Sequence, residues 1–94
     1  MRVGCPKEIK VHEYRVGLTP ESAAELVRYG HDVFLETKAG EGIGAPDSVY
    51  EKVGVKILPN ADAVFAEAEM IVKVKEPQAI EIARLKSKHT LFTY

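Results

Sequence analysis

Two cations in this sequence each follow a segment that is predicted to be a strand. Arg15 lies in the charge-dense stretch after the apolar MRVGC, and Lys75 comes directly after the apolar MIVKV, residues 70–74. A guanidinium can hold a carboxylate through two parallel hydrogen bonds, and an ammonium at a strand end can join it on the same small anion. The alternative for Arg15 is a solvated surface charge. The alternative for Lys75 is a lysine whose stem covers apolar surface.

The elements that would position this pair alternate along the chain. Strands are predicted over residues 1–5, 31–37, 55–58, 70–74 and 90–94, and helices over 20–29, 48–53, 61–68 and 79–86. Thr19, Asp47 and Asn60 are expected as N-caps, with Gly30 and Gly54 ending two of the helices. Parallel strands joined by helices make right-handed crossovers, so we expect an α/β fold with an open, doubly wound, mainly parallel sheet of five strands, Rossmann- or flavodoxin-like.

In such a sheet, ligands bind beyond the carboxyl ends of the strands. The segment after the first strand, residues 7–18, and the segment after the fourth, residues 73–77, both belong there. Arg15 and Lys75 are therefore expected to converge. Two cations at one concave spot repel each other unless an anion joins them, which points to a small anionic ligand.

Composition excludes several classes of protein. With 94 residues the chain is one domain at most, and its net charge of −1 gives no electrostatic case for nucleic acid or an anionic membrane. It has no apolar run of the roughly 20 residues that a membrane helix needs. The single cysteine allows no internal disulfide, which fits a reducing, cytoplasmic location.

GEGIGA, residues 40–45, matches the dinucleotide-binding pattern G-x-G-x-x-A, with Asp62 about twenty residues on. Pro46 stands where the helix of such a motif should already be running. Asp62 falls in a predicted helix, whereas a ribose-binding acid belongs at the end of a strand. We therefore interpret the segment as a glycine loop that leads to an Asp47 cap, and we expect no cofactor-binding residue in this chain.

The histidines and the cysteine offer no metal or nucleophilic site. HEYRV is half of a zinc-protease motif, but Val16 occupies the position of the second ligand. His31 and His89 are interpreted as solvated loop residues. Cys5 is interpreted as a small buried hydrophobe.

Several longer motifs resemble the N-terminal segment of the alanine dehydrogenase family, in register over residues 1–94. They are MRVGCPKEIK, HEYRVGLTP, GH-V--ET-AG-G-G, MIVKVKEP and the terminal LFTY. The most specific are E-x-R-V-x-L-T-P, Glu13 to Pro20, and V-K-V-K-E-P, Val72 to Pro77. The related nucleotide-binding α subunit of proton-translocating transhydrogenase shares the first motif but usually lacks the Lys75-Glu76-Pro77 pattern.

The resemblance implies NAD-dependent, reversible oxidative deamination of L-alanine to pyruvate and ammonium. Arg15 would bind the substrate carboxylate, and Lys75 would contact the substrate near its carbonyl or carboxylate oxygen. The family's acid–base histidine is expected just after Tyr94, so no catalytic residue lies in this chain. Residues 1–94 would be the N-terminal part of the substrate-binding domain, with the NAD-binding domain outside it, in a cytoplasmic homo-oligomer, commonly a hexamer. The fragment alone is expected to be inactive.

Three alternatives stay open. The first is the N-terminal domain of a transhydrogenase α subunit. The second is a small-carboxylate-binding module without catalysis, if the chain naturally ends at Tyr94. The third, a receiver-like signalling domain, is disfavoured because it needs acidic residues after the first and third strands, where Pro6-Lys7 and Pro59-Asn60 stand.

Overall fold

The computed structural model describes residues 1–9, 14–74 and 90–93. Lys75, His89 and the helix predicted over 79–86 lie outside the described residues. Five strands form one sheet in the order β3-β2-β1-β4-β5. Their bounds are β1 Arg2–Cys5, β2 Asp32–Glu36, β3 Lys56–Leu58, β4 Met70–Lys73 and β5 Thr90–Thr93. Every pairing is parallel, which confirms the predicted doubly wound α/β sheet.

The helices begin where polar side chains can accept hydrogen bonds from exposed backbone amides. In α1, Pro20–Arg28, the Thr19 hydroxyl accepts from the Ser22 amide, and in α3, Ala61–Glu67, Asn60 Oδ1 accepts from the Ala63 amide. Both N-caps are confirmed. Gly30 and Gly54 adopt positive φ angles of 90° and 100° directly after α1 and α2, which confirms them as stops because glycine takes this conformation without strain.

The prediction that Asp47 caps the second helix was wrong. In α2, Asp47–Lys52, Asp47 is the first helical residue and the extended Pro46 precedes it. The Asp47 carboxylate serves the turn after β2 instead, accepting from the Lys38 amide at 2.9 Å and the Thr37 hydroxyl at 2.5 Å. Because Lys38 has a φ of +67°, which is unusual for a residue with a side chain, this tie holds a conformation that the turn would not favour alone.

The glycine segment before α2 forms a short 3-10 helix, η1, Glu41–Ile43, rather than an irregular loop. It does not open a long helix as a dinucleotide-binding turn would, and Asp62 lies in α3 as predicted. Both observations agree with the rejection of a fingerprint at residues 40–45.

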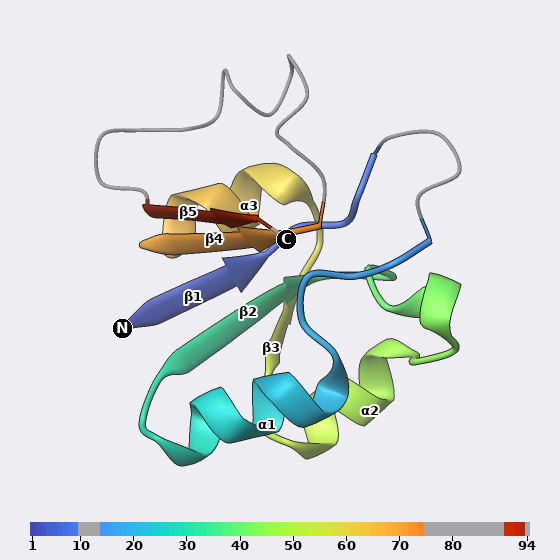
Figure 1. The fold of residues 1–94 in the computed structure, drawn as a ribbon, viewed down its shortest axis with the longest axis horizontal. Helices are drawn as coiled ribbons and strands as arrows, with labels where there is room; N and C mark the ends of the chain where they lie inside the picture. Colours follow the sequence, from blue (N-terminus) through green and yellow to red (C-terminus); the bar gives the residue numbers. More distant parts are fainter. Residues whose placement is uncertain (10–13, 75–89, 94) are drawn as a thin grey trace.

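Helices cover both faces of the sheet, with α1 and α2 on one side and α3 on the other (Figure 1). The larger core cluster packs under α1 and α2 and includes Val3, Cys5, Ala23, Leu35 and Tyr50. The smaller cluster under α3 consists of Phe65, Ala68 and Ile71. A sheet covered on one face would bury only one of these sets, so the two clusters account for the continuous apolar runs in the strands.

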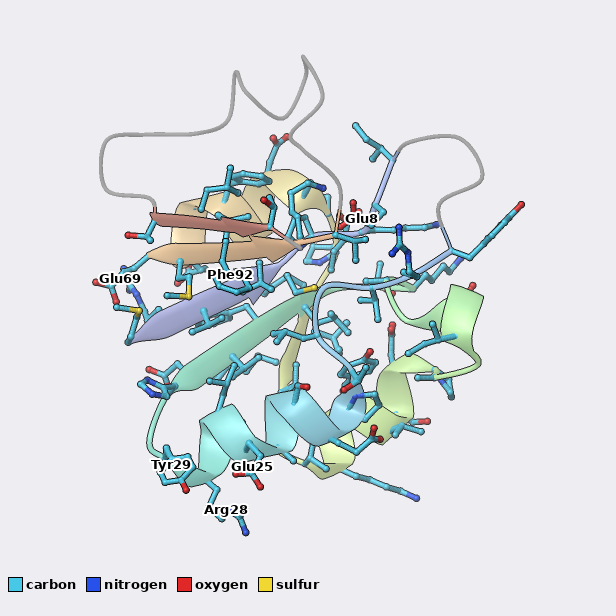
Figure 2. All side chains as sticks on the ribbon, in the orientation of Figure 1. Glu8, Glu25, Arg28, Tyr29, Glu69 and Phe92 are labelled. Carbon is cyan, nitrogen blue, oxygen red and sulfur yellow. The ribbon has the colours of Figure 1, made fainter. Side chains whose placement is uncertain are left out.

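The strand order reverses at β1, which lies between β2 and β4. The chain leaves β1 for α1 on one face of the sheet and reaches β4 from α3 on the other face, so a crevice is expected at the carboxyl ends of β1 and β4. The segments after these two strands, residues 7–18 and 73–77, are the two that carry Arg15 and Lys75. β5 forms one edge of the sheet, and its Phe92 is 51% exposed (Figure 2).

Candidate functional site

Arg15 lies shortly before α1, in the described stretch that approaches β4 closely at Gly17. Its side chain is exposed and lines two cavities, of about 390 and 240 Å³. The larger is also lined by Val16, Gly17, Thr19, Ser22, Ile43 and Val74. Val74 is the residue directly before Lys75. The structure therefore places Arg15 on the same cavity as Val74, the first residue after β4. Lys75 lies outside the described residues, so its convergence with Arg15 stays a prediction.

The smaller cavity is the more highly charged. Its lining includes the cationic Lys7, Arg15 and Lys38 and the carboxylates of Glu8 and Glu41. Each cation comes from a segment that follows a strand, since Lys7 and Arg15 come after β1 and Lys38 comes after β2. The arrangement suits a small anion better than an apolar ligand.

Backbone contacts bring the Arg15 segment this close to the sheet. A Cβ atom at Gly17 would lie 2.6 Å from the carbonyl oxygen of Val72 in β4. A Cβ atom at Gly42 in η1 would lie 2.2 Å from the carbonyl oxygen of Tyr14. Real Cβ atoms do not approach this closely, so glycine at these two positions lets the segment pass between β4 and η1.

A buried ion pair beside this segment was missed by the sequence interpretation. Lys73 Nζ lies 3.2 Å from Glu8 Oε1, and the side chains are 1% and 2% exposed. Figure 2 shows Glu8 at the carboxyl end of the sheet, where the segment after β1 passes the end of β4. The available signal was a lysine inside the apolar strand MIVKV, because a buried lysine requires a partner.

The Tyr50 hydroxyl and the Cys5 thiol belong to two further residues that are fully buried. Tyr50 of α2 donates a hydrogen bond from its hydroxyl to the Leu18 carbonyl at 2.7 Å, which joins α2 to the end of the Arg15 segment. Desolvation raises the pKa of Tyr50 to about 12. The pKa of the Cys5 thiol is raised to about 12, mainly by desolvation and in smaller part by the nearby Glu8 charge, while hydrogen bonding to the backbone of Leu18 and Gly17 and the Lys73 charge oppose the shift. Cys5 is thus a buried, neutral thiol, as predicted.

No three His, Cys, Asp or Glu side chains gather as metal ligands among residues 1–9, 14–74 and 90–93. In the same part of the chain, no helix has the length and apolar character needed to cross a membrane. His31 lies 3.2 Å, through Nδ1, from the N-terminal amine, at the opposite end of β1 from the cavities.

Residues 4–94 match the family described as "Alanine dehydrogenase/PNT, N-terminal domain". The chain is 52% identical over its whole length to an alanine dehydrogenase of Halomonas elongata, of which it covers 25%. It is 42% identical to the NAD(P) transhydrogenase subunit alpha of Cereibacter sphaeroides, of which it covers 18%.

A solved structure of an L-alanine dehydrogenase superposes on the whole chain with a TM-score of 0.96, at 47% identity, and the chain covers 26% of it. The sequence therefore spans about a quarter of the length of the alanine dehydrogenases it matches.

Proposed function

Because the chain belongs to the alanine dehydrogenase/PNT N-terminal domain family, we propose that it is the first part of the substrate-binding domain of an NAD-dependent alanine dehydrogenase. The whole enzyme would convert L-alanine, water and NAD⁺ to pyruvate, ammonium, NADH and a proton, and would run the reverse amination. The observation that supports this most directly is Arg15 on the cavity at the strand-order reversal, beside the end of β4.

In this proposal Arg15 binds the substrate carboxylate through the two parallel donors of its guanidinium and so orients the substrate. Lys75 contacts the substrate carbonyl or carboxylate oxygen. Its charge stabilises the negative charge that develops on the carbonyl oxygen when the carbinolamine forms or breaks down. The Glu8–Lys73 pair and the buried Tyr50 hold the surrounding backbone.

The described residues do not fit an NAD site, since the one glycine-rich candidate forms a 3-10 helix followed by a helix of six residues. NAD, when bound, accepts the hydride, and this chemistry belongs to the cofactor. The proposal therefore assigns NAD and the acid–base histidine to parts of the enzyme outside residues 1–94. A cytoplasmic location and assembly as a homo-oligomer, with six subunits expected, are part of the same proposal. Light scattering on the full-length protein tests the number of subunits.

The test of Arg15 is Arg15→Lys in the full-length protein. Lysine keeps the charge but loses the two-pronged geometry, so KM for alanine and for pyruvate should rise about 10- to 100-fold, from the loss of about 1.5–3 kcal/mol in a charged hydrogen bond. KM for NADH should stay the same. Arg28→Lys is the matched control, because Arg28 is exposed on the last turn of α1 and pairs with Glu25 (Figure 2). Unchanged KM values for alanine and pyruvate in Arg15→Lys would remove Arg15 from the site.

Lys75→Ala separates binding from chemistry. It should lower kcat as well as raise KM, because an ammonium that stabilises developing charge acts mainly in the transition state. Ordinary turnover in this variant would refute the role of Lys75.

The 42% identity to a transhydrogenase α subunit supports a second candidate, in which the same domain belongs to such a subunit. Alanine-dependent formation of NADH by the full-length protein supports the dehydrogenase. Binding of NADH without any alanine-dependent reaction supports the transhydrogenase subunit.

A further inference from the structure

Apolar side chains at positions 8 and 73 could stabilise the fold about as well as the buried Glu8–Lys73 ion pair does. Removing a carboxylate and an ammonium from water is costly, and replacing a buried ion pair with well-packed apolar residues often leaves a protein as stable or more so. Stability alone therefore does not explain why these two residues are charged, and the contacts that they make are the better guide to their role.

The two oxygens of Glu8 have different partners. Oε1 lies 3.2 Å from Lys73 Nζ, and Oε2 accepts a hydrogen bond from the Val74 amide at 3.1 Å. Val74 lies just beyond the last residue of β4, where the chain leaves the sheet. One carboxylate from the segment after β1 thus fixes both the last residue of β4 and the first residue beyond it.

The Glu8–Val74 hydrogen bond joins two residues that each line a cavity together with Arg15. Glu8 and Arg15 belong to the same segment and line the same charged cavity. Val74 lines the larger cavity with Arg15 and directly precedes Lys75 in the sequence. A shift of the Val74 backbone would therefore change the shape of the cavity that Arg15 lines.

We propose that Glu8 is a positioning residue, whose carboxylate holds the Val74 amide and thereby fixes the Val74 backbone on the cavity that Arg15 lines, for substrate binding. Lys73 neutralises Glu8, so that a buried negative charge does not compete with the substrate carboxylate for Arg15. This inference rests on the proposed function of Arg15 and Lys75.

Two double variants of the full-length enzyme separate positioning from stability. Glu8→Gln with Lys73→Met removes both charges but keeps an amide oxygen that can accept from Val74. Glu8→Met with Lys73→Met removes both charges and that acceptor, and it leaves no polar side-chain atom at either position. If only the ion pair matters, the two variants should have the same KM for pyruvate, because both lack the pair. The Met/Met variant also leaves the buried Val74 amide without its acceptor, so it should be the less stable of the two.

Positioning predicts a difference in substrate binding as well. KM for pyruvate should be at least about 10-fold higher in the Met/Met variant than in the Gln/Met variant, with KM for NADH equal. Equal KM values for pyruvate in the two would overturn the proposal. Should either double variant fail to fold, Glu8→Asp replaces them, because the shorter side chain cannot reach both Lys73 Nζ and the Val74 amide. A wild-type KM for pyruvate in Glu8→Asp would equally overturn it.

The unmodified enzyme is assayed first with alanine and NAD. If it has no alanine-dependent activity, the proposed function fails, and the positioning contact is then tested by hydrogen exchange at the Val74 amide. Faster exchange in the Met/Met variant than in the Gln/Met variant supports the contact. Equal exchange rates in the two variants would overturn it without reference to any substrate.

Discussion

Replacing Gly17 with alanine should push the Arg15 segment away from β4. The new Cβ would lie 2.6 Å from the Val72 carbonyl oxygen, about 0.8 Å short of an ordinary contact. It would also lie 2.9 Å from the Val72 carbonyl carbon, so no side-chain rotation can relieve the overlap. Val72 is held in the sheet opposite Phe92 of β5. The Gly17 segment must therefore move.

The size of the effect follows from this overlap. Forcing one methyl group into a closely packed contact typically costs about 1–3 kcal/mol. A displacement approaching 1 Å in a residue that orients the substrate can reduce activity by about 100-fold. We therefore expect a lower Tm together with a KM for alanine and pyruvate that is about 10- to 100-fold higher in the full-length enzyme.

Gly30→Ala is the matched control. Gly30 has a φ of +90°, and a Cβ atom there would meet no other atom within 4 Å, so alanine costs about 1–2 kcal/mol of backbone strain without any overlap. Gly30 precedes β2, at the end of the sheet opposite the cavities. Its replacement should lower the Tm without changing either KM. A Gly17→Ala enzyme with the wild-type KM for pyruvate would refute the link between this close approach and the site.

Three further predictions concern stability. Tyr50→Phe leaves the Leu18 carbonyl without its buried donor and should lower the free energy of unfolding by about 1–3 kcal/mol in denaturant titrations, whereas no change would mean that water replaces the hydroxyl. Asn60→Ala should lower the free energy of unfolding by about 0.5–2 kcal/mol in the same titrations, because alanine has no oxygen to accept from the Ala63 amide. Asn60→Asp keeps such an oxygen and should lower it much less. Equal losses in the two variants would contradict the N-cap. The pKa of the Cys5 thiol rises from its ordinary 9.0 to about 12 in the folded state, so between these pH values the folded state keeps a proton that the unfolded state has lost. As pH rises through this range, Cys5 should lower the free energy of unfolding by about 1.4 kcal/mol per pH unit. A Cys5→Ala variant that loses stability just as steeply with pH would refute this contribution of Cys5.

The order of strands and helices could be predicted because local signals coincide with it. Thr19-Pro20 and Asn60 start helices, Gly30 and Gly54 stop them, and apolar runs between these points form the strands. Parallel pairing then follows from the intervening helices. The convergence of residues 7–18 with the end of β4 could be predicted from the same topology.

The tertiary partners of polar side chains could not be predicted in this way. Asp47 has the sequence context of a cap, yet its carboxylate bonds to the turn at Thr37 and Lys38, which lies beside it only in the folded sheet. Glu8 and Lys73 are 65 positions apart, and no local pattern joins them. Such pairings depend on which strands are neighbours, and the alternation of elements along the chain leaves that order open.

The central position of β1 has a consequence for synthesis. β1 is made before both of its neighbours, and its pairing with β4 joins Val3 to Met70, which lies 67 positions further along the chain. At a ribosomal rate of about 5–20 residues per second, that edge of β1 waits roughly 3–13 s for its neighbour to emerge. During this interval β1 can pair with β2 but not yet with β4, so the edge of β1 that β4 covers in the folded sheet stays open to a chaperone until β4 is made.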